Sequence, residues 1–119
     1  MSTHTILVVE DEDESRQALV EILDFYGFQA VGVANGAEAM DYLRVSETPP
    51  LIILDLLMPV MSGSRLRAAL LQAPDLANIP VIVVSALDSF AVTEFGAVRT
   101  FTKPLDIDAL VRVVRKYCL

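Results

Sequence analysis

The sequence predicts a doubly wound α/β fold, in which helices cover both faces of a parallel sheet. Continuous apolar runs rich in β-branched residues recur at positions 6–9, 51–54 and 81–84. Runs without a polar residue at every second position are typical of strands that are buried on both faces. Stretches with helical apolar spacing separate them. Because crossovers between parallel strands are right-handed, we expect the C-terminal ends of all the strands at one edge of the sheet.

The first half of the chain contains two helical patterns between predicted strands. The first helix ends before Gly27, a residue that suits the position after a helix C-terminus. Residues 28–33 form the second predicted strand, and Pro49-Pro50 imposes an extended approach to the strand that begins at Leu51. The apolar positions of these helices are Leu19, Ile22, Leu23 and Tyr26 in the first and Ala37, Met40 and Leu43 in the second.

The second half of the chain continues the alternation of helices and strands. A third helix is expected over 64–73 and ends at Pro74, since proline lacks the N–H that a helix interior needs. Residues 100–102 form the fifth predicted strand, and Asp106 is a favourable N-cap for the last helix. The apolar positions of these two helices are Leu66, Ala69, Leu70 and Ala73, and Ile107, Leu110, Val111 and Val114.

Length and composition predict one soluble domain over residues 1–119. The hydrophobic content of 54% predicts a large core, and the net charge of −7 disfavours nucleic-acid binding. No apolar run approaches the roughly 20 residues that cross a bilayer, and the N-terminus lacks a signal-peptide pattern. We therefore expect a cytoplasmic protein with no membrane association. The single cysteine, Cys118, cannot form an internal disulfide and is expected to act as a small apolar side chain.

Polar side chains stand at the C-terminal ends of four predicted strands. In chain order they are Glu10 and Asp11, Asp55, Ser85, and Lys103. Open α/β sheets bind their ligands at this edge. A strand order of 2-1-3-4-5 places the first and third strands side by side, and it therefore places Glu10 and Asp11 beside Asp55.

The residue types at this edge are suited to handling phosphate with Mg²⁺. Three neighbouring carboxylates repel one another unless a cation neutralises them, and Mg²⁺ is often held by one or two carboxylates together with phosphate oxygens. An ionised aspartate is a recognised nucleophile toward phosphorus, and an ammonium stabilises phosphoryl oxygens. Taken singly, each residue has an ordinary alternative as a helix cap, a turn residue or a solvated charge. Their joint occurrence at strand ends favours one site.

Four motifs carry a resemblance to a known family. They are residues 6–12, which include Glu10-Asp11; residues 55–63, which begin at Asp55; residues 84–86, around Ser85; and Lys103-Pro104. With these motifs, the chain resembles the receiver domains of bacterial two-component response regulators over nearly all of its length. The resemblance implies a flavodoxin-like (βα)5 fold with a five-stranded sheet of order 2-1-3-4-5, and a single receiver domain without an output domain.

By this resemblance, Asp55 accepts a phosphoryl group from a phosphohistidine on a sensor histidine kinase or a phosphotransfer protein. Glu10 and Asp11 match the acidic pair that holds Mg²⁺, together with Asp55 and the backbone carbonyl of Leu57. The chain would then act as a phosphorylation-dependent switch or relay in signalling.

The resemblance also implies roles for two residues of the later strands. Lys103 matches the lysine that contacts the phosphoryl group, and Ser85 matches the hydroxyl that moves toward it. The protein would catalyse only its own phosphorylation and dephosphorylation and would not be an enzyme toward other molecules. An unknown downstream protein would read its state, and a homodimer is one option for its assembly.

Two features depart from the family pattern on the side that usually transmits the signal. Thr100 stands three residues before Lys103, where the family usually has an aromatic residue, and the neighbouring Phe101 is expected on the opposite face of its strand. The stretch between Ser85 and Gly96 is about four residues short, so we expect a shortened or irregular fourth helix. A receiver-like scaffold or dimerisation module that does not switch therefore remains an alternative.

Leucines at two positions near the predicted phosphoryl group bear on its lifetime and on other functions. Leu57 and Leu87 stand where polar residues of the family guide an attacking water, which predicts slow autodephosphorylation. A phosphatase of the haloacid dehalogenase type needs a second aspartate at position 57 and is disfavoured. Flavin and dinucleotide binding are disfavoured because the acidic residues 10–14 replace a glycine-rich phosphate loop.

Overall fold

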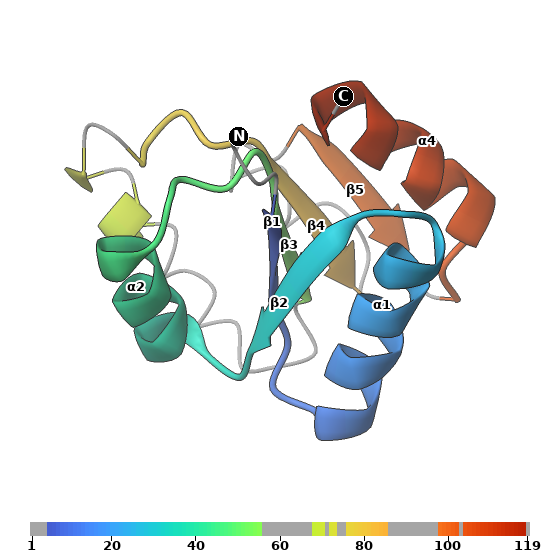
Figure 1. Cartoon of the computed structure of the whole chain (residues 1–119), viewed down its shortest axis with the longest axis horizontal. Helices are drawn as coiled ribbons and strands as arrows, with labels where there is room; N and C mark the ends of the chain where they lie inside the picture. Colours follow the sequence, from blue (N-terminus) through green and yellow to red (C-terminus); the bar gives the residue numbers. More distant parts are fainter. Residues whose placement is uncertain are drawn as a thin grey trace.

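The sheet of this protein has five parallel strands in the order β2-β1-β3-β4-β5 (Figure 1). The computed structural model describes residues 5–55, 68–70, 72–73, 76–85, 98–102 and 104–118, without the side chains of Asp55, Ser85 and Thr102. The strands are β1 (Thr5–Val9), β2 (Gln29–Val33), β3 (Ile52–Asp55), β4 (Val81–Ser85) and β5 (Arg99–Thr102). The predicted flavodoxin-like fold and its strand order are therefore confirmed.

Helices cover both faces of the sheet, as the continuous apolar strands predict. α1 (Asp13–Phe25) and α4 (Ile107–Cys118) lie on one face, and α2 (Gly36–Val45) lies on the other (Figure 1). Of the third predicted helix, residues 68–70 and 72–73 are described: 68–70 and 72 are helical, whereas Ala73, the last predicted residue, lies in a bend. The predicted short fourth helix falls between Ser85 and Gly96, outside the described residues.

The core has two layers because successive strand residues point to opposite faces. One layer joins Leu7, Val9, Ile52, Leu54, Val81 and Val83 to Ala39 and Leu43 of α2 and to Leu70. The other joins Ile6, Val8, Ile53, Ile82 and Val84 to Leu19 and Leu23 of α1 and to Leu110, Val114 and Cys118 of α4. Each strand of β1, β3 and β4 thus contributes to both layers, which holds its C-terminal end in a fixed place.

The end of α1 follows the sequence prediction at Gly27. Gly27 has a φ of +90°, a conformation that glycine adopts without a steric penalty. Its N–H donates to the carbonyl of Asp24, and the N–H of Phe28 donates to the carbonyl of Leu23. These two bonds form a Schellman motif, and Leu23 and Phe28 pack in the same layer of the core.

Side-chain caps set the starts of α2 and α4. The Asn35 side chain accepts the Glu38 N–H at 2.9 Å, while Glu38 accepts the N–H of Ala34 at 2.8 Å. At α4, the carboxylate of Asp106 accepts the N–H of Ala109 at 3.2 Å, which confirms Asp106 as the N-cap. In the part of the chain that the structure describes, no helix combines the length and the apolar character needed to cross a membrane.

β5 presents its central residues to different faces. Thr100 is level with Val83, which belongs to the layer under α2, whereas Phe101 is level with Val84 and packs in the layer under α1 and α4. Phe101 therefore lies on the opposite face from Thr100, as predicted. The guanidinium of Arg99 covers the Phe101 ring at 5.1 Å from its centroid.

Candidate functional site

The strand register brings two of the predicted acidic positions side by side. β1 and β3 are parallel neighbours, with Val9 level with Leu54. The next residue along β1 is Glu10, and the next along β3 is Asp55. The backbones of these two residues therefore lie next to each other at the C-terminal edge of the sheet, as the predicted strand order requires.

The same register extends across β4 and β5. Asp55 is level with Val84, and Ser85 is level with Thr102, the residue before Lys103. The backbones of Asp55 and Ser85 thus end neighbouring strands at one edge. The predicted contributions of Lys103, of the Leu57 carbonyl and of the Asp55 and Ser85 side chains lie outside the described part of the structure.

Glu10 is a fully buried carboxylate, with 0% of its surface exposed. Its backbone N–H donates to the carbonyl of Val33 at 3.0 Å, which extends the pairing of β1 and β2 by one residue. Its Oε2 accepts the backbone N–H of Glu12 at 2.8 Å. Asp11, the next residue, is exposed, so the pair offers one buried and one accessible carboxylate.

This pair fits a Mg²⁺ site in its chemistry. Both residues offer carboxylate oxygens, the ligands that Mg²⁺ prefers, and a buried carboxylate such as that of Glu10 is stabilised by a cation or by hydrogen bonds. No cluster of three or more His, Cys, Asp or Glu side chains occurs within the described residues. The third acid of the predicted trio is Asp55, whose side chain belongs to the undescribed part. Glu10 and Asp11 would hold Mg²⁺ from one side of the edge.

Arg16 joins this edge although its sequence position gave no prediction for it. Its Nη1 donates to the backbone carbonyl of Glu10 at 3.0 Å, and its Nη2 pairs with the carboxylate of Asp13. The aliphatic part of the Arg16 side chain, here called its stem, crosses β2 at Gly32. A Cβ added to Gly32 would lie 2.7 Å from Cγ of Arg16. A glycine inside a predicted strand is the signal that was available, since it often marks a close approach by another group.

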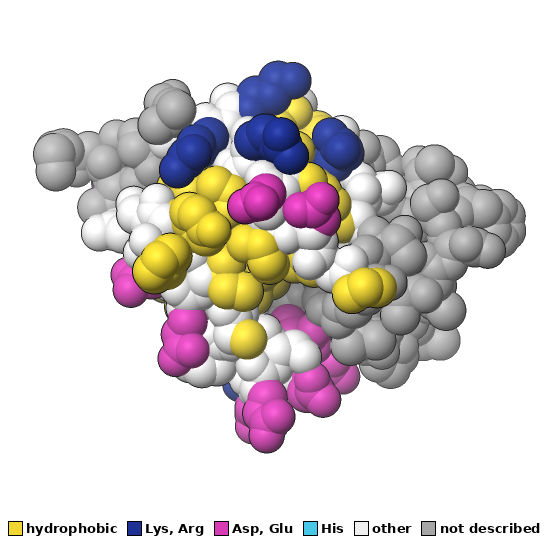
Figure 2. Space-filling model, turned by 90° about the vertical axis from the view of Figure 1, so that its right-hand side faces the viewer, with side chains coloured by type: hydrophobic (Ala, Val, Ile, Leu, Met, Phe, Trp, Pro, Cys, Tyr) yellow, Lys and Arg dark blue, Asp and Glu magenta, His cyan; other side chains and the backbone are white. Residues whose placement is uncertain are grey.

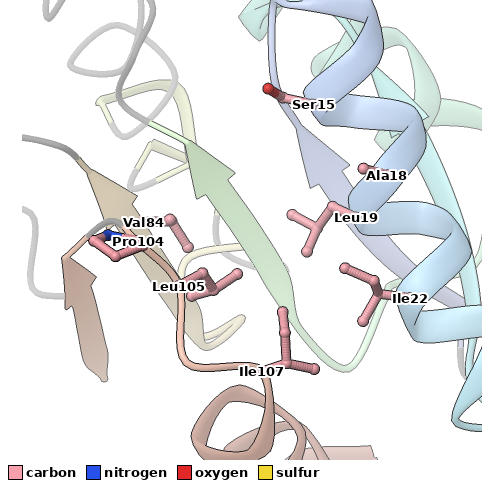
Figure 3. A pocket seen from close by; sticks show the side chains of 8 residues that line it. All are labelled: Ser15, Ala18, Leu19, Ile22, Val84, Pro104, Leu105 and Ile107. Atoms are coloured by element: carbon pink, nitrogen blue, oxygen red, sulfur yellow. The ribbon is translucent and has the colours of Figure 1, made fainter.

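An apolar groove lies beside the acidic edge, on the face that α1 and α4 cover. It has a volume of about 290 Å³ and lies between α1 and the segment that enters α4 (Figure 3). Its lining consists of Ser15, Ala18, Leu19 and Ile22 from α1, Val84 from β4, and Pro104, Leu105 and Ile107. Val84 directly precedes Ser85, and Pro104 directly follows Lys103, so the groove borders the predicted phosphorylation site.

Charges of opposite sign flank this face. Figure 2 shows basic side chains gathered over α4 at the top, some acidic side chains directly below them and more toward the start of α1 at the bottom, with apolar side chains in the middle of the face. The exposed basic residues of α4 are Arg112, Arg115 and Lys116, and exposed acids run from Asp11 to Glu14. The basic residues of the last turn also complement the helix dipole, as the sequence suggests.

Comparison with known proteins gives consistent matches over nearly the whole chain. The family model of the response regulator receiver domain matches residues 6–115. The sporulation initiation phosphotransferase F of Bacillus subtilis is 35% identical over 98% of this chain and 95% of that protein. The polar-differentiation response regulator DivK of Brucella anthropi is 26% identical over 95% of this chain and 94% of that protein.

Solved structures agree with the sequence matches. A response regulator receiver protein from Pseudomonas putida superposes with a TM-score of 0.87 and 32% identity over 98% of each chain. The signal receiver domain of a signal transduction histidine kinase from Syntrophus aciditrophicus gives 0.85 and 37% identity over 98% of this chain and 90% of that one. With the fold, the acidic edge and these matches in agreement, the chain belongs to the response regulator receiver domain family.

Proposed function

We propose that Asp55 accepts a phosphoryl group from a phosphohistidine on a sensor histidine kinase or a phosphotransfer protein, with Mg²⁺ held at Glu10 and Asp11. Membership of the receiver family makes the chain a phosphorylation-dependent signalling switch or relay. The observation that carries the assignment to Asp55 is the strand register, which sets this residue next to the fully buried Glu10 at the edge where parallel sheets do their chemistry.

The transfer exchanges one bond to phosphorus for another. A carboxylate oxygen of Asp55 attacks the phosphorus, and the O–P bond forms as the P–N bond to the donor imidazole breaks. The imidazole nitrogen leaves with the bonding electron pair and takes up a proton. When bound, Mg²⁺ neutralises charge on the phosphoryl oxygens, and Lys103 would add a second positive charge there. The carbonyl of Leu57 would complete the protein ligands, and the hydroxyl of Ser85 would donate to the phosphoryl group.

The groove next to this site is suited to docking the phosphodonor protein. Its walls are apolar apart from Ser15, and it is continuous with the segments that carry Ser85 and Lys103. An apolar side chain from the donor protein, seated between Ala18 and Leu105, would hold the donor close to Asp55. Burying that side chain contributes about 1.5–3 kcal/mol, which is enough to orient an otherwise transient complex.

Acetyl phosphate with Mg²⁺ tests the proposal without any partner protein. Mass spectrometry of the intact chain should show the mass of one added phosphoryl group, and the addition should vanish when Mg²⁺ is chelated. Asp55→Asn removes the nucleophile and should remain unmodified under the same conditions. A wild-type chain that stays unmodified would favour a receiver-like scaffold instead, and modification of the Asp55→Asn variant would move the acceptor to another residue.

A further inference from the structure

We infer that Arg16 is a positioning residue of the acidic edge, which fixes the turn from Glu10 to Asp11 in the geometry that receives Mg²⁺. The inference rests on the proposed Mg²⁺ site and concerns how the chain builds it. Its consequence is specific: loss of the Arg16 guanidinium weakens Mg²⁺ binding, although it removes a positive charge from the neighbourhood of a cation.

Glu10 is held by hydrogen bonds at its backbone N–H, its carbonyl and its carboxylate. The N–H donates to Val33 at 3.0 Å and the carboxylate accepts from Glu12 at 2.8 Å, both through backbone partners. The carbonyl accepts from Nη1 of Arg16 at 3.0 Å. Among these described bonds, the Arg16 bond alone comes from another residue's side chain. It is therefore a bond that a side-chain substitution can remove without changing the backbone.

The Arg16 side chain is itself held in one place. Its Nη2 pairs with Asp13, one turn earlier on α1, and the side chain is only 22% exposed. Its stem lies across β2, where the missing side chain of Gly32 leaves the space: an added Cβ would be 2.7 Å from Cγ and 3.0 Å from Cδ of Arg16. The strand thus has no side chain at the point where the arginine crosses it to reach Glu10.

The two ways in which Arg16 acts on a metal have opposite signs. A guanidinium near the edge repels a divalent cation, so a role through charge alone predicts tighter Mg²⁺ binding after its removal. A role in orienting the ligands predicts weaker binding, because partners of metal ligands typically change metal affinity about 10- to 100-fold when they are lost. The direction of the change therefore separates the two roles.

Arg16→Lys is the principal test, because it keeps the charge and most of the stem but loses the planar fork that bonds the Glu10 carbonyl and Asp13 together. Calorimetric titration of Mg²⁺ should give a Kd about tenfold weaker than that of the unaltered chain. Arg16→Met should weaken binding in the same direction. Tighter binding by Arg16→Met with no change in Arg16→Lys would assign Arg16 a charge effect only and overturn the inference.

Arg44→Lys is the matched control. Arg44 pairs with Asp41 at 2.9 Å with the same three-residue spacing, but it lies on α2 with an exposed fraction of 67% and belongs to no described bond of the acidic edge. The Kd of the Arg44→Lys variant for Mg²⁺ should equal that of the unaltered chain. If Arg44→Lys raised the Kd for Mg²⁺ as much as Arg16→Lys does, replacing any surface arginine would weaken Mg²⁺ binding. That result would overturn the assignment to Arg16.

Gly32→Ala tests the same contact from the other side. The new methyl group should displace the Arg16 side chain and weaken Mg²⁺ binding. In an Arg16→Ala background only its contact with Val20, at 3.3 Å from Cγ2, remains, so Mg²⁺ binding should change little further. Such non-additivity is expected of residues in direct contact. Equal effects of Gly32→Ala in the two backgrounds would show that it acts without Arg16 and would contradict the proposed coupling.

A readout without metal separates positioning from general stability. In the metal-free chain, the Glu12 amide that donates to Glu10 should exchange with solvent faster in Arg16→Lys, while the amides of α2 should exchange as before. If the unaltered chain binds no Mg²⁺, the proposed function fails and the inference falls with it. If the unaltered chain binds Mg²⁺ and Arg16→Lys binds it equally tightly, the inference alone fails.

Discussion

Glu10 shows how a single residue links folding to function. It lies at the end of an apolar strand, is 0% exposed, and yet carries a carboxylate. Burying a charged group costs free energy unless hydrogen bonds or a cation compensate for it. A neutral side chain would be the simpler choice for stability at this position. We therefore interpret the acid as a residue kept for the chemistry at the sheet edge.

Cys118 illustrates the opposite case, a reactive group used for packing. It lies in the core layer under α4, and burial raises the pKa of its thiol. A raised pKa keeps the group protonated at neutral pH, and the thiol is the unreactive form. This agrees with its expected role as a small apolar side chain.

Gly27 gives a prediction at the residue scale. Its φ of +90° is strained for any residue with a Cβ, so Gly27→Ala should lower the free energy of unfolding by about 1 kcal/mol. Urea denaturation measures the difference. Gly36→Ala is the control, because Gly36 lies in the first turn of α2, where alanine favours the helix and stability should stay equal or rise. Equal losses in both variants would contradict the backbone explanation.

At the scale of elements, α1 serves both the acidic edge and the groove. Its first turn supplies the Arg16 contact to Glu10, and the next turns supply Ala18 and Ile22 to the groove wall. A partner that docks against α1 would therefore contact the same helix that bonds the carbonyl of Glu10 through Arg16.

Ala18→Glu tests the groove at this scale. A carboxylate in the apolar groove should slow phosphoryl transfer from a phosphohistidine-bearing protein by about tenfold, because docking would bury an unpaired charge. Phosphorylation by acetyl phosphate should continue at the normal rate, since that small donor needs no groove. Ala37→Glu makes the same change at an exposed position of α2 and should leave both rates unchanged. If Ala18→Glu slowed phosphorylation by both donors, the substitution would have damaged the phosphorylation site itself.

The features that the sequence predicted correctly are those that depend on neighbouring residues. The glycine after α1 and the cap at Asp106 depend on residues within one turn, and both were found in advance. The Arg16 contact depends on α1 lying across β2, so it combines distant positions, Arg16 and Gly32, that carry no joint pattern. The groove was missed for the same reason, since its lining comes from α1, β4 and the entry to α4.

At the scale of the whole molecule, the two core layers explain why the edge is well placed. Strand residues alternate between the layers, so β1 and β3 are packed on both faces up to Val9 and Leu54, the residues that precede Glu10 and Asp55. The continuous apolar runs were enough to predict a parallel sheet, whereas its strand order was predicted from known doubly wound folds and the family resemblance. How the chain would transmit a signal was not predictable to the same degree, because Thr100 departs from the family and gives no substitute for the missing aromatic ring.

Mg²⁺ should stabilise the whole molecule if it binds at this edge. A ligand that binds only the folded state adds about 2.7 kcal/mol when its concentration is about 100 times its Kd. Thermal unfolding with and without Mg²⁺ should show a higher midpoint with the metal, and chelation should reverse it. Asp11→Asn weakens the site without entering the core and should remove most of the shift. A shift of full size in that variant would place the metal elsewhere.

The bonds around Glu10 have a consequence for the order in which the site forms. The described hydrogen bonds of Glu10 join it to Glu12, Arg16 and Val33, all of which lie within the first third of the chain. Loops that close such short sequence separations lose little chain entropy, and contacts of this kind form early in folding. The described bonds that hold Glu10 can therefore form as β1, α1 and β2 come together during synthesis, while the strand that ends in Asp55 is still being made.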